Sequence, residues 1–256
     1  MDEKELIKMI NEVFGSDMPR LGPGENVSTQ KALDILSSKG LKLNDPKLRV
    51  IDIGCGNGIQ TLEMAKRVNG TILAVDNHEP YLNELRRRAE VAGVDSKIST
   101  LLEDMAKLTS KEERFDLVWS EGALFCMGFR EGIAACYSLL APGGMAAATE
   151  LVWLQPDPPE ECFGFFNAVY PPMTTVGENL RAIRSYGFEI LDHFTLSEMA
   201  WRDNYLSELG ARLPAFREKY SGNKDKLEFI DLFQKEIDIY EKYSSWYGYE
   251  FFLMQK

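Results

Sequence analysis

Val50-Ile51-Asp52-Ile53-Gly54-Cys55-Gly56-Asn57-Gly58 is the most informative stretch of this 256-residue chain. It joins a short apolar run, which predicts a β-strand over residues 48–53, to a segment with helical character over residues 61–68. Glycines at such a junction let the backbone turn sharply and approach a ligand closely. A dinucleotide-binding loop would place its third glycine at position 59, which is Ile59, whereas this chain places it one residue earlier, at Gly58. The spacing therefore disfavours a dinucleotide site.

Strand and helix patterns alternate along the rest of the chain. Further strands are expected over residues 71–75, 97–102, 115–119, 145–154, 189–195 and 247–254, and helices over 81–92, 132–140, 161–169 and 179–186, with a turn at 142–144. Repeated β-α units of this length imply a parallel sheet with helices on both faces. The predicted fold class is α/β and Rossmann-like, with a mostly parallel seven-stranded sheet. Two late amphipathic segments, with apolar stripes through Leu209 and Ile230, are expected to form a helical lid inserted between the last two strands.

Acidic residues follow two of these strands directly. Asp76 ends the second strand, where a carboxylate can accept hydrogen bonds from both ribose hydroxyls of a nucleoside. Glu103-Asp104-Met105 follows the third strand. Because the carboxyl ends of parallel strands meet at one rim of the sheet, these acids and the glycine turn are expected to face a common ligand. Taken alone, Asp104 would more often be a helix cap.

Composition narrows the choice of partner and compartment. The net charge of −11 repels phosphate backbones, so no nucleic-acid partner is expected. No apolar run is long enough to span a bilayer, and the first ten residues lack the pattern of a secretory signal, which predicts a cytoplasmic protein without a membrane partner. The four cysteines have no C-x-x-C spacing and the two histidines are far apart, so no metal is expected.

The G-x-G-x-G turn preceded by Asp52 resembles motif I of class I S-adenosylmethionine-dependent methyltransferases. Other segments are similar to small bacterial and archaeal methyltransferases related to the ubiquinone- and menaquinone-biosynthesis type: Arg20-Leu21-Gly22-Pro23-Gly24, Gln60-Thr61-Leu62, Trp119-Ser120-Glu121-Gly122-Ala123, Met127-Gly128-Phe129 and Tyr247-Gly248-Tyr249-Glu250-Phe251. The resemblance covers nearly the whole chain. It implies a single methyltransferase domain over residues 1–256, with N-terminal helices (1–44), a cofactor-binding core (45–155) and substrate-side helices, lid and last two strands (156–256).

The resemblance also implies the cofactor, S-adenosylmethionine, and its product, S-adenosylhomocysteine. In this family an acid after the third strand accepts from the adenine amino group and a backbone amide contacts the ring, roles that fall on Asp104 and Met105. The residues expected to bind the cofactor are Arg20, Asp52, Gly54, Cys55, Gly56, Gly58, Gln60, Asp76, Asn77, Asp104, Met105 and Ser120.

Two further acids are candidates for catalysis. Glu121 comes just after the fourth strand, and Glu150 interrupts the apolar fifth strand, where a carboxylate is costly to bury without a partner. Either could orient an acceptor amine or act as a general base; the alternative is a salt bridge or an exposed edge position. Expected pocket aromatics, which could equally be core residues, are Trp119, Phe125, Trp153, Tyr170, Trp201 and Tyr205. Gly22-Pro23-Gly24 is either a turn between helices or a flap over the cofactor.

The predicted function is methyl transfer to a small-molecule acceptor. The alternatives are a nucleotide-dependent oxidoreductase and a catalytically silent cofactor-binding module. A base-directed nucleic-acid methyltransferase would carry Asn/Asp-Pro-Pro-aromatic after the fourth strand, where this chain has Ser120-Glu121-Gly122-Ala123. The acceptor atom, the metabolite that carries it and the oligomeric state stay open.

Overall fold

The computed structural model describes residues 2–108 and 114–256. Its sheet has the strand order β3-β2-β1-β4-β5-β8-β7, and a short β6 pairs with β5 off this path. The bounds are β1 (Arg49–Ile53), β2 (Thr71–Asp76), β3 (Ile98–Leu102), β4 (Phe115–Ser120), β5 (Leu140–Trp153), β6 (Thr174–Thr175), β7 (Glu189–Thr195) and β8 (Tyr247–Gln255). Strands β1 to β5 run parallel, and β8 is antiparallel to both β5 and β7. The predicted α/β class and mostly parallel seven-strand path are confirmed, and β6 is an addition.

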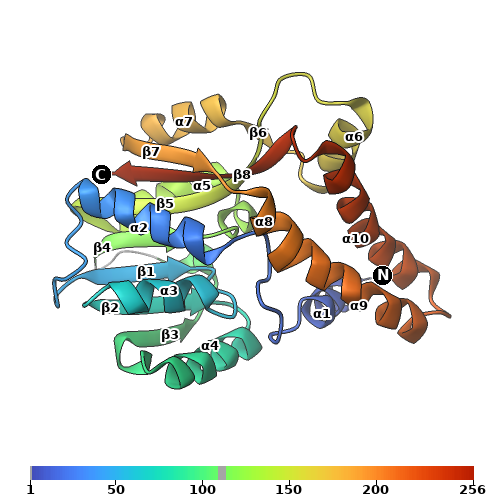
Figure 1. Ribbon diagram of the computed structural model, residues 1–256, viewed down its shortest axis with the longest axis horizontal. Helices are drawn as coiled ribbons and strands as arrows, with labels where there is room; N and C mark the ends of the chain where they lie inside the picture. The colour runs from blue at the N-terminus through green and yellow to red at the C-terminus, as the bar shows by residue number, and fades with distance from the viewer. Residues whose placement is uncertain (1, 109–113) are drawn as a thin grey trace.

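Helices cover both faces of the sheet (Figure 1). Side chains of α2 (Asn26–Ser38), α3 (Ile59–Arg67) and α4 (Glu79–Ala92) belong to one apolar cluster, and those of α5 (Phe129–Leu139) and α7 (Val176–Ser185) belong to a second. Strand β1 contributes side chains to both clusters, because Val50 packs in the first while Ile51 and Ile53 pack in the second. This alternation follows from the two-residue period of a strand and explains why the central strands are apolar on both faces.

Most of the remaining helical segments lie beyond the carboxyl ends of the parallel strands, whereas the 3₁₀ turn before β3 lies at an amino end. The segment between β7 and β8 forms α8 (Glu198–Trp201), a π-helix η4 (Arg202–Leu206), α9 (Ser207–Lys219) and α10 (Lys224–Tyr243), which is the predicted lid insertion. Helix α1 (Glu3–Val13) lies beside α9 (Figure 1). Helix α6 (Glu160–Val169) and the 3₁₀ turns η1 (Asp95–Lys97), η2 (Met105–Lys107) and η3 (Leu124–Cys126) complete the described elements. No described helix has the length and apolar character needed to cross a bilayer.

The predicted turn at Pro142-Gly143-Gly144 is wrong, because these residues lie inside β5. The register with β4 shifts there, since Phe115 pairs with Leu140 but Leu117 pairs with Met145. The end of the chain supports this irregular stretch: Lys256 N donates to Gly144 O at 2.9 Å, and Gly143 N donates to Lys256 O at 3.1 Å. A turn-forming composition thus becomes a bulged strand once the last residue of the chain supplies partners for its backbone.

The strand order reverses between β1 and β4, because the chain first builds outward from β1 to β3 and then returns to β4. Open α/β sheets bind ligands in the crevice outside the strand ends at such a switch point. The fold therefore places the residues after β1, β2, β3 and β4 around one crevice, beneath α1 and the lid.

Candidate active site

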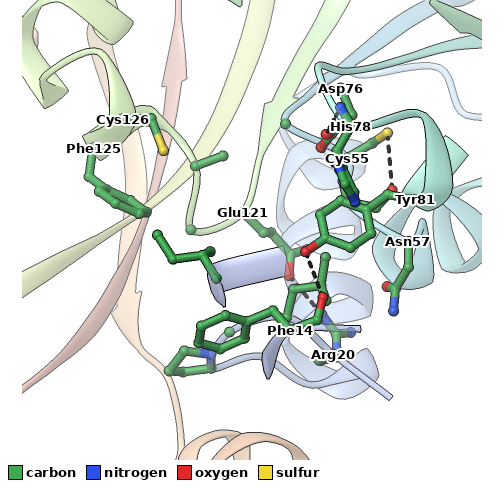
Figure 2. Close-up of a pocket in the computed structure, with 18 of the residues that line it drawn as sticks. Phe14, Arg20, Cys55, Asn57, Asp76, His78, Tyr81, Glu121, Phe125 and Cys126 are labelled. Atoms are coloured by element: carbon green, nitrogen blue, oxygen red, sulfur yellow. Dashed lines mark hydrogen bonds and ion pairs between the residues drawn. The ribbon is translucent and has the colours of Figure 1, made fainter. Parts of the chain in front are cut away.

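A cavity of about 1020 Å³ occupies this crevice. It is lined by the segments that follow β1 to β4, by α1 and the loop after it, and by residues of η4, α10 and β8. Figure 2 shows part of this lining, with Asp76 and Cys55 at one end and Phe125 and Cys126 across the cavity. Its size is at the upper end of the range for small-molecule sites, roughly 300–1,000 Å³.

The glycine turn fits tightly against its neighbours. Gly54 has φ +69°, and a Cβ atom there would lie 2.3 Å from the Cβ of Ala123 in the loop after β4. The amides of Gly54 and Cys55 both donate to Val75 O at 2.9 Å. Only glycine satisfies the left-handed backbone and this close approach together. The turn is therefore a rigid part of the cavity wall.

Asp76 is held in place by backbone amides on either side. Its Oδ2 accepts from Gly56 N and its Oδ1 accepts from His78 N, each at 2.9 Å. Burial raises the pKa of this carboxyl above its usual value, although the two amides oppose the shift. Each carboxylate oxygen can accept more than one hydrogen bond. Asp76 is thus preoriented in the cavity wall with capacity left for hydroxyl donors.

Asp104 also lines the cavity, and its Oδ1 caps η2 by accepting from Ala106 N at 2.9 Å. The helix-cap interpretation of Asp104 is therefore correct for one oxygen. No donor from the described residues is recorded for the other, Oδ2. That oxygen is available to a ligand amino group.

Nine of the twelve predicted cofactor residues line the cavity: Arg20, Gly54, Cys55, Gly56, Gln60, Asp76, Asn77, Asp104 and Met105. The other three lie behind the lining. Asp52 is fully buried and accepts from Thr61 Oγ1 at 2.6 Å, and burial raises its pKa to about 7. Ser120 Oγ donates to Ile53 O at 2.9 Å, and Gly58 packs against Leu85. These three brace the turn instead of facing the cavity.

Glu121 lies in the cavity wall and accepts hydrogen bonds from three directions. Its donors are Arg20 Nη1 at 3.2 Å, Thr29 Oγ1 at 2.7 Å and Trp119 Nε1 at 3.0 Å. The side chains of Arg20 and Glu121 are only 8% and 6% exposed, so this is a buried ion pair. The pair is visible near the centre of Figure 2. Trp119 is fully buried and packs on Phe251, so its indole serves the core and the Glu121 carboxylate.

Glu150 lies behind the cavity lining and accepts a hydrogen bond from the Tyr170 hydroxyl. Burial raises the pKa of its carboxyl to about 7. Tyr170 packs edge-on against Phe125, at 6.0 Å between ring centroids, and Phe125 lines the cavity. Trp153 also lies outside the lining, since it packs against aromatic residues of α6 and β8. Glu150 is therefore neither at an exposed edge nor in a recorded salt bridge among the described residues.

The lid end of the cavity holds Trp201 and Tyr205, as expected, together with residues that the sequence did not single out. Glu236 is the most informative of these. It lies between Phe233, Ile237 and Tyr240 on the apolar stripe of α10, so an acid on an otherwise apolar helix face was the available signal. Other cavity-lining residues missed by sequence reasoning include Phe14, His78, Tyr81, Cys126 and Phe166. Within the described residues, no group of three or more His, Cys, Asp or Glu side chains is arranged to hold a metal.

Comparison with known proteins agrees with this geometry. Residues 50–144 match a family model described as a methyltransferase domain. The sterol 24-C-methyltransferase of Pneumocystis carinii (strain B80) is 26% identical over 156 residues, which cover 58% of this chain and 41% of that protein. The matched region thus spans about two fifths of that relative's length.

Solved structures extend the likeness to the whole chain. An S-adenosylmethionine-dependent methyltransferase from Geobacter sulfurreducens, solved in complex with S-adenosyl-L-homocysteine, has a TM-score of 0.80 at 18% identity and covers 96% of each chain. The [4+2]-cyclase SpnF has a TM-score of 0.73 at 20% identity, over 98% of this chain and 92% of that one. At such identities these similarities establish the fold. Residues 50–144 therefore resemble a methyltransferase domain, and the chain as a whole has the fold of the class I methyltransferases.

Proposed function

We propose that this protein transfers a methyl group from S-adenosylmethionine to a small-molecule acceptor and releases S-adenosylhomocysteine. The observation that carries this proposal is the continuity of one cavity. It joins the glycine turn, Asp76 and Asp104 at the strand ends to an aromatic region under the lid. A cavity of about 1020 Å³ has room for a nucleoside and a second small molecule side by side.

The wall residues fit an adenosyl ligand. Asp76, with both oxygens fixed by amides, suits the ribose hydroxyls, and the free Oδ2 of Asp104 suits the adenine amino group. Met105 lies beside Asp104 in the lining, where its backbone amide can contact the ring. Arg20 lies with the loop 21–23 in the cavity wall and suits the carboxylate of the methionyl part. The bound cofactor supplies a methyl group on a positively charged sulfur, which is already activated for displacement.

The chain must then hold the acceptor close and aligned, and exclude water. Positioning of this kind can contribute roughly 7–11 kcal/mol at best. Glu121 is engaged by three donors, which favours an electrostatic and orienting role over proton transfer. Glu150, with its raised pKa, is the better group to hold a proton, and Tyr170 lies between it and the ring of Phe125 in the cavity wall. The size of the cavity and the net charge of −11 support a small molecule as acceptor.

Calorimetric titration with S-adenosylmethionine and S-adenosylhomocysteine tests the cofactor assignment. Asp76→Asn is expected to weaken binding of S-adenosylhomocysteine by ~10–100-fold, because one charged acceptor is lost. Asp116→Asn is the matched control. Asp116 also accepts a hydrogen bond from a backbone amide, that of Arg49 at 2.9 Å, but it lies outside the cavity lining. This control should retain the native affinity. Absence of any uptake of either compound by the native protein would refute the proposal.

Turnover is tested by labelled methyl transfer from S-adenosylmethionine into metabolite extracts. Incorporation into a small molecule is expected. Because the same fold occurs in a protein described as a [4+2]-cyclase, cofactor binding without any incorporation would favour a silent module or a different reaction. Binding of a reduced nicotinamide cofactor, followed by absorbance, would favour the oxidoreductase alternative.

A further inference from the structure

The cavity has an aromatic end beneath the lid. Five ring-bearing side chains line it there, contributed by the segment after α1, by α6, by the α8–η4 segment and by β8: Phe14, Phe166, Trp201, Tyr205 and Tyr249. One carboxylate, that of Glu236 on α10, lies among them. We call these six residues the aromatic-carboxylate site.

The rings of this site are held in fixed relative positions. Phe14 stacks on Tyr205, with ring centroids 6.3 Å apart and planes 8° apart. Trp201 lies 6.4 Å from Tyr205 and 5.6 Å from Tyr249, and its outer face stacks on Tyr240 at 4.8 Å. Tyr205 belongs to the π-helix, a local distortion that is often found at functional sites. These contacts between rings give the site a defined shape.

Glu236 has no cationic partner among the described residues. Its two oxygens are each 3.3 Å from the Tyr205 hydroxyl, which is its one recorded donor. Burial raises the pKa of this carboxyl to about 7. Glu121, by contrast, has Arg20 as its ion-pair partner in the same cavity. A half-buried carboxylate without a cation is costly, and a ligand that carries a positive charge would reduce that cost.

The rest of the lining, as far as its residues are described, has no positive charge left for an anionic group of the acceptor once Arg20 serves the cofactor. Its basic residues are Arg20, which is paired with Glu121, and His78 at the far end next to Asp76. Four acids share the wall: Asp76, Asp104, Glu121 and Glu236. Aromatic faces attract cations through the negative charge above each ring. The aromatic rings and the carboxylate of Glu236 therefore both favour a positively charged ligand.

We propose that the aromatic-carboxylate site binds a positively charged alkylammonium group of the methyl acceptor. The role of the ligand as a methyl acceptor rests on the proposed function. Binding of the ammonium group itself depends only on the aromatic-carboxylate site. Glu236 provides the opposite charge, and the rings enclose the alkyl groups on nitrogen.

Choline and 3,3-dimethylbutan-1-ol are suitable probes, because they have the same shape and differ in the charge of one central atom. Calorimetric titration of the native protein, with and without saturating S-adenosylhomocysteine, should show choline binding ~10-fold more tightly than the alcohol. Glu236→Gln should abolish this preference. Glu241→Gln, an exposed acid on the same helix, should preserve it.

A second pair of variants distinguishes the effect of the Tyr205 ring on binding from any effect on folding. Tyr205→Phe keeps the aromatic face and should retain the preference for choline, whereas Tyr205→Leu should reduce it, with circular dichroism confirming that both variants are folded. Equal binding of the two probes, failure of choline to bind, or an unchanged preference in Glu236→Gln would each overturn the proposal. Uptake of S-adenosylhomocysteine with no preference for choline would refute this site alone, and absence of that uptake would refute the proposed function instead.

Discussion

At the scale of single residues, Glu121 illustrates how a predicted catalytic acid acquires its role from its partners. The sequence places it directly after β4, and the three donors that reach it come from the loop before α2, from α2 itself and from β4. Replacing it by glutamine would leave Arg20 buried without a negative partner, which is usually costly. Glu121→Gln is expected to lower turnover more than cofactor affinity, and equal losses in both would assign Glu121 to the cofactor site.

Gly54 makes a sharper prediction, because a matched control exists. Gly54→Ala should lower the free energy of unfolding by ~1–2 kcal/mol for the left-handed backbone and by at least ~1 kcal/mol more for the overlap with Ala123. Gly93 has nearly the same φ, +66° against +69°, but a Cβ there meets nothing within 4 Å. Gly93→Ala should therefore show the backbone cost alone. Urea unfolding measures both, and equal losses would show that the wall relaxes around the new methyl group.

At the scale of elements, the loop at 20–24 is connected to the lid. Gly24 N donates to Ala200 O of α8 at 3.1 Å, and Asn204 Nδ2 of the π-helix donates to Gly24 O at 3.0 Å. The same loop contributes Leu21, Gly22 and Pro23 to the cavity wall. These contacts favour the interpretation of the loop as a flap that moves together with the lid. They disfavour a turn that merely separates two helices.

Asn204→Ala tests this connection. Loss of one side-chain hydrogen bond should increase cleavage of the loop by a protease in the free protein, because the loop opens more often. Saturating S-adenosylhomocysteine should protect the loop in the native protein and protect it less in the variant. Asn83→Ala serves as the control, because Asn83 is exposed and accepts a hydrogen bond from the exposed Arg86. Equal cleavage with and without S-adenosylhomocysteine in the native protein would contradict the flap.

At the scale of the whole molecule, buried acids link stability to pH. Asp52, Glu150 and Glu236 each have a pKa raised to about 7 by burial. In the unfolded chain these groups titrate near 4, so between pH 4 and 7 the folded protein binds more protons than the unfolded chain. Their contribution to the free energy of unfolding is therefore present at low pH and is lost as the pH rises through 7.

Glu150→Gln isolates one part of this effect. The variant should gain ~1–3 kcal/mol over the native protein at pH 8, where the native carboxyl is ionised and buried, and the difference should shrink towards pH 5. Tyr170 can still donate to the amide oxygen, so its hydrogen bond is retained. Glu90→Gln, at an exposed position on α4, should show no such pH dependence. Urea unfolding at both pH values measures the difference, and a constant difference would contradict the raised pKa.

The sequence alone was sufficient for the features that depend on neighbours in the chain. The glycine spacing, the acid after β2 and the alternation of strand and helix are local patterns, and the carboxyl ends of parallel strands must share a rim. The position of the lid follows from such patterns, whereas the order of the strands comes from the structure. The acids Asp76 and Asp104 therefore lie together in the cavity wall, as their positions implied.

Only the tertiary structure decided which side chains meet across long stretches of chain. Arg20 and Glu121 are 101 residues apart, and Phe14 reaches Tyr205 across 191 positions, so no local pattern predicts either contact. Glu236 is a further example. Its sequence position reveals an acid on the apolar stripe of α10, but it does not predict the aromatic rings that share the cavity wall with it. The physical reason is that burial and pairing are properties of several elements packed together, whereas periodicity is a property of each element alone.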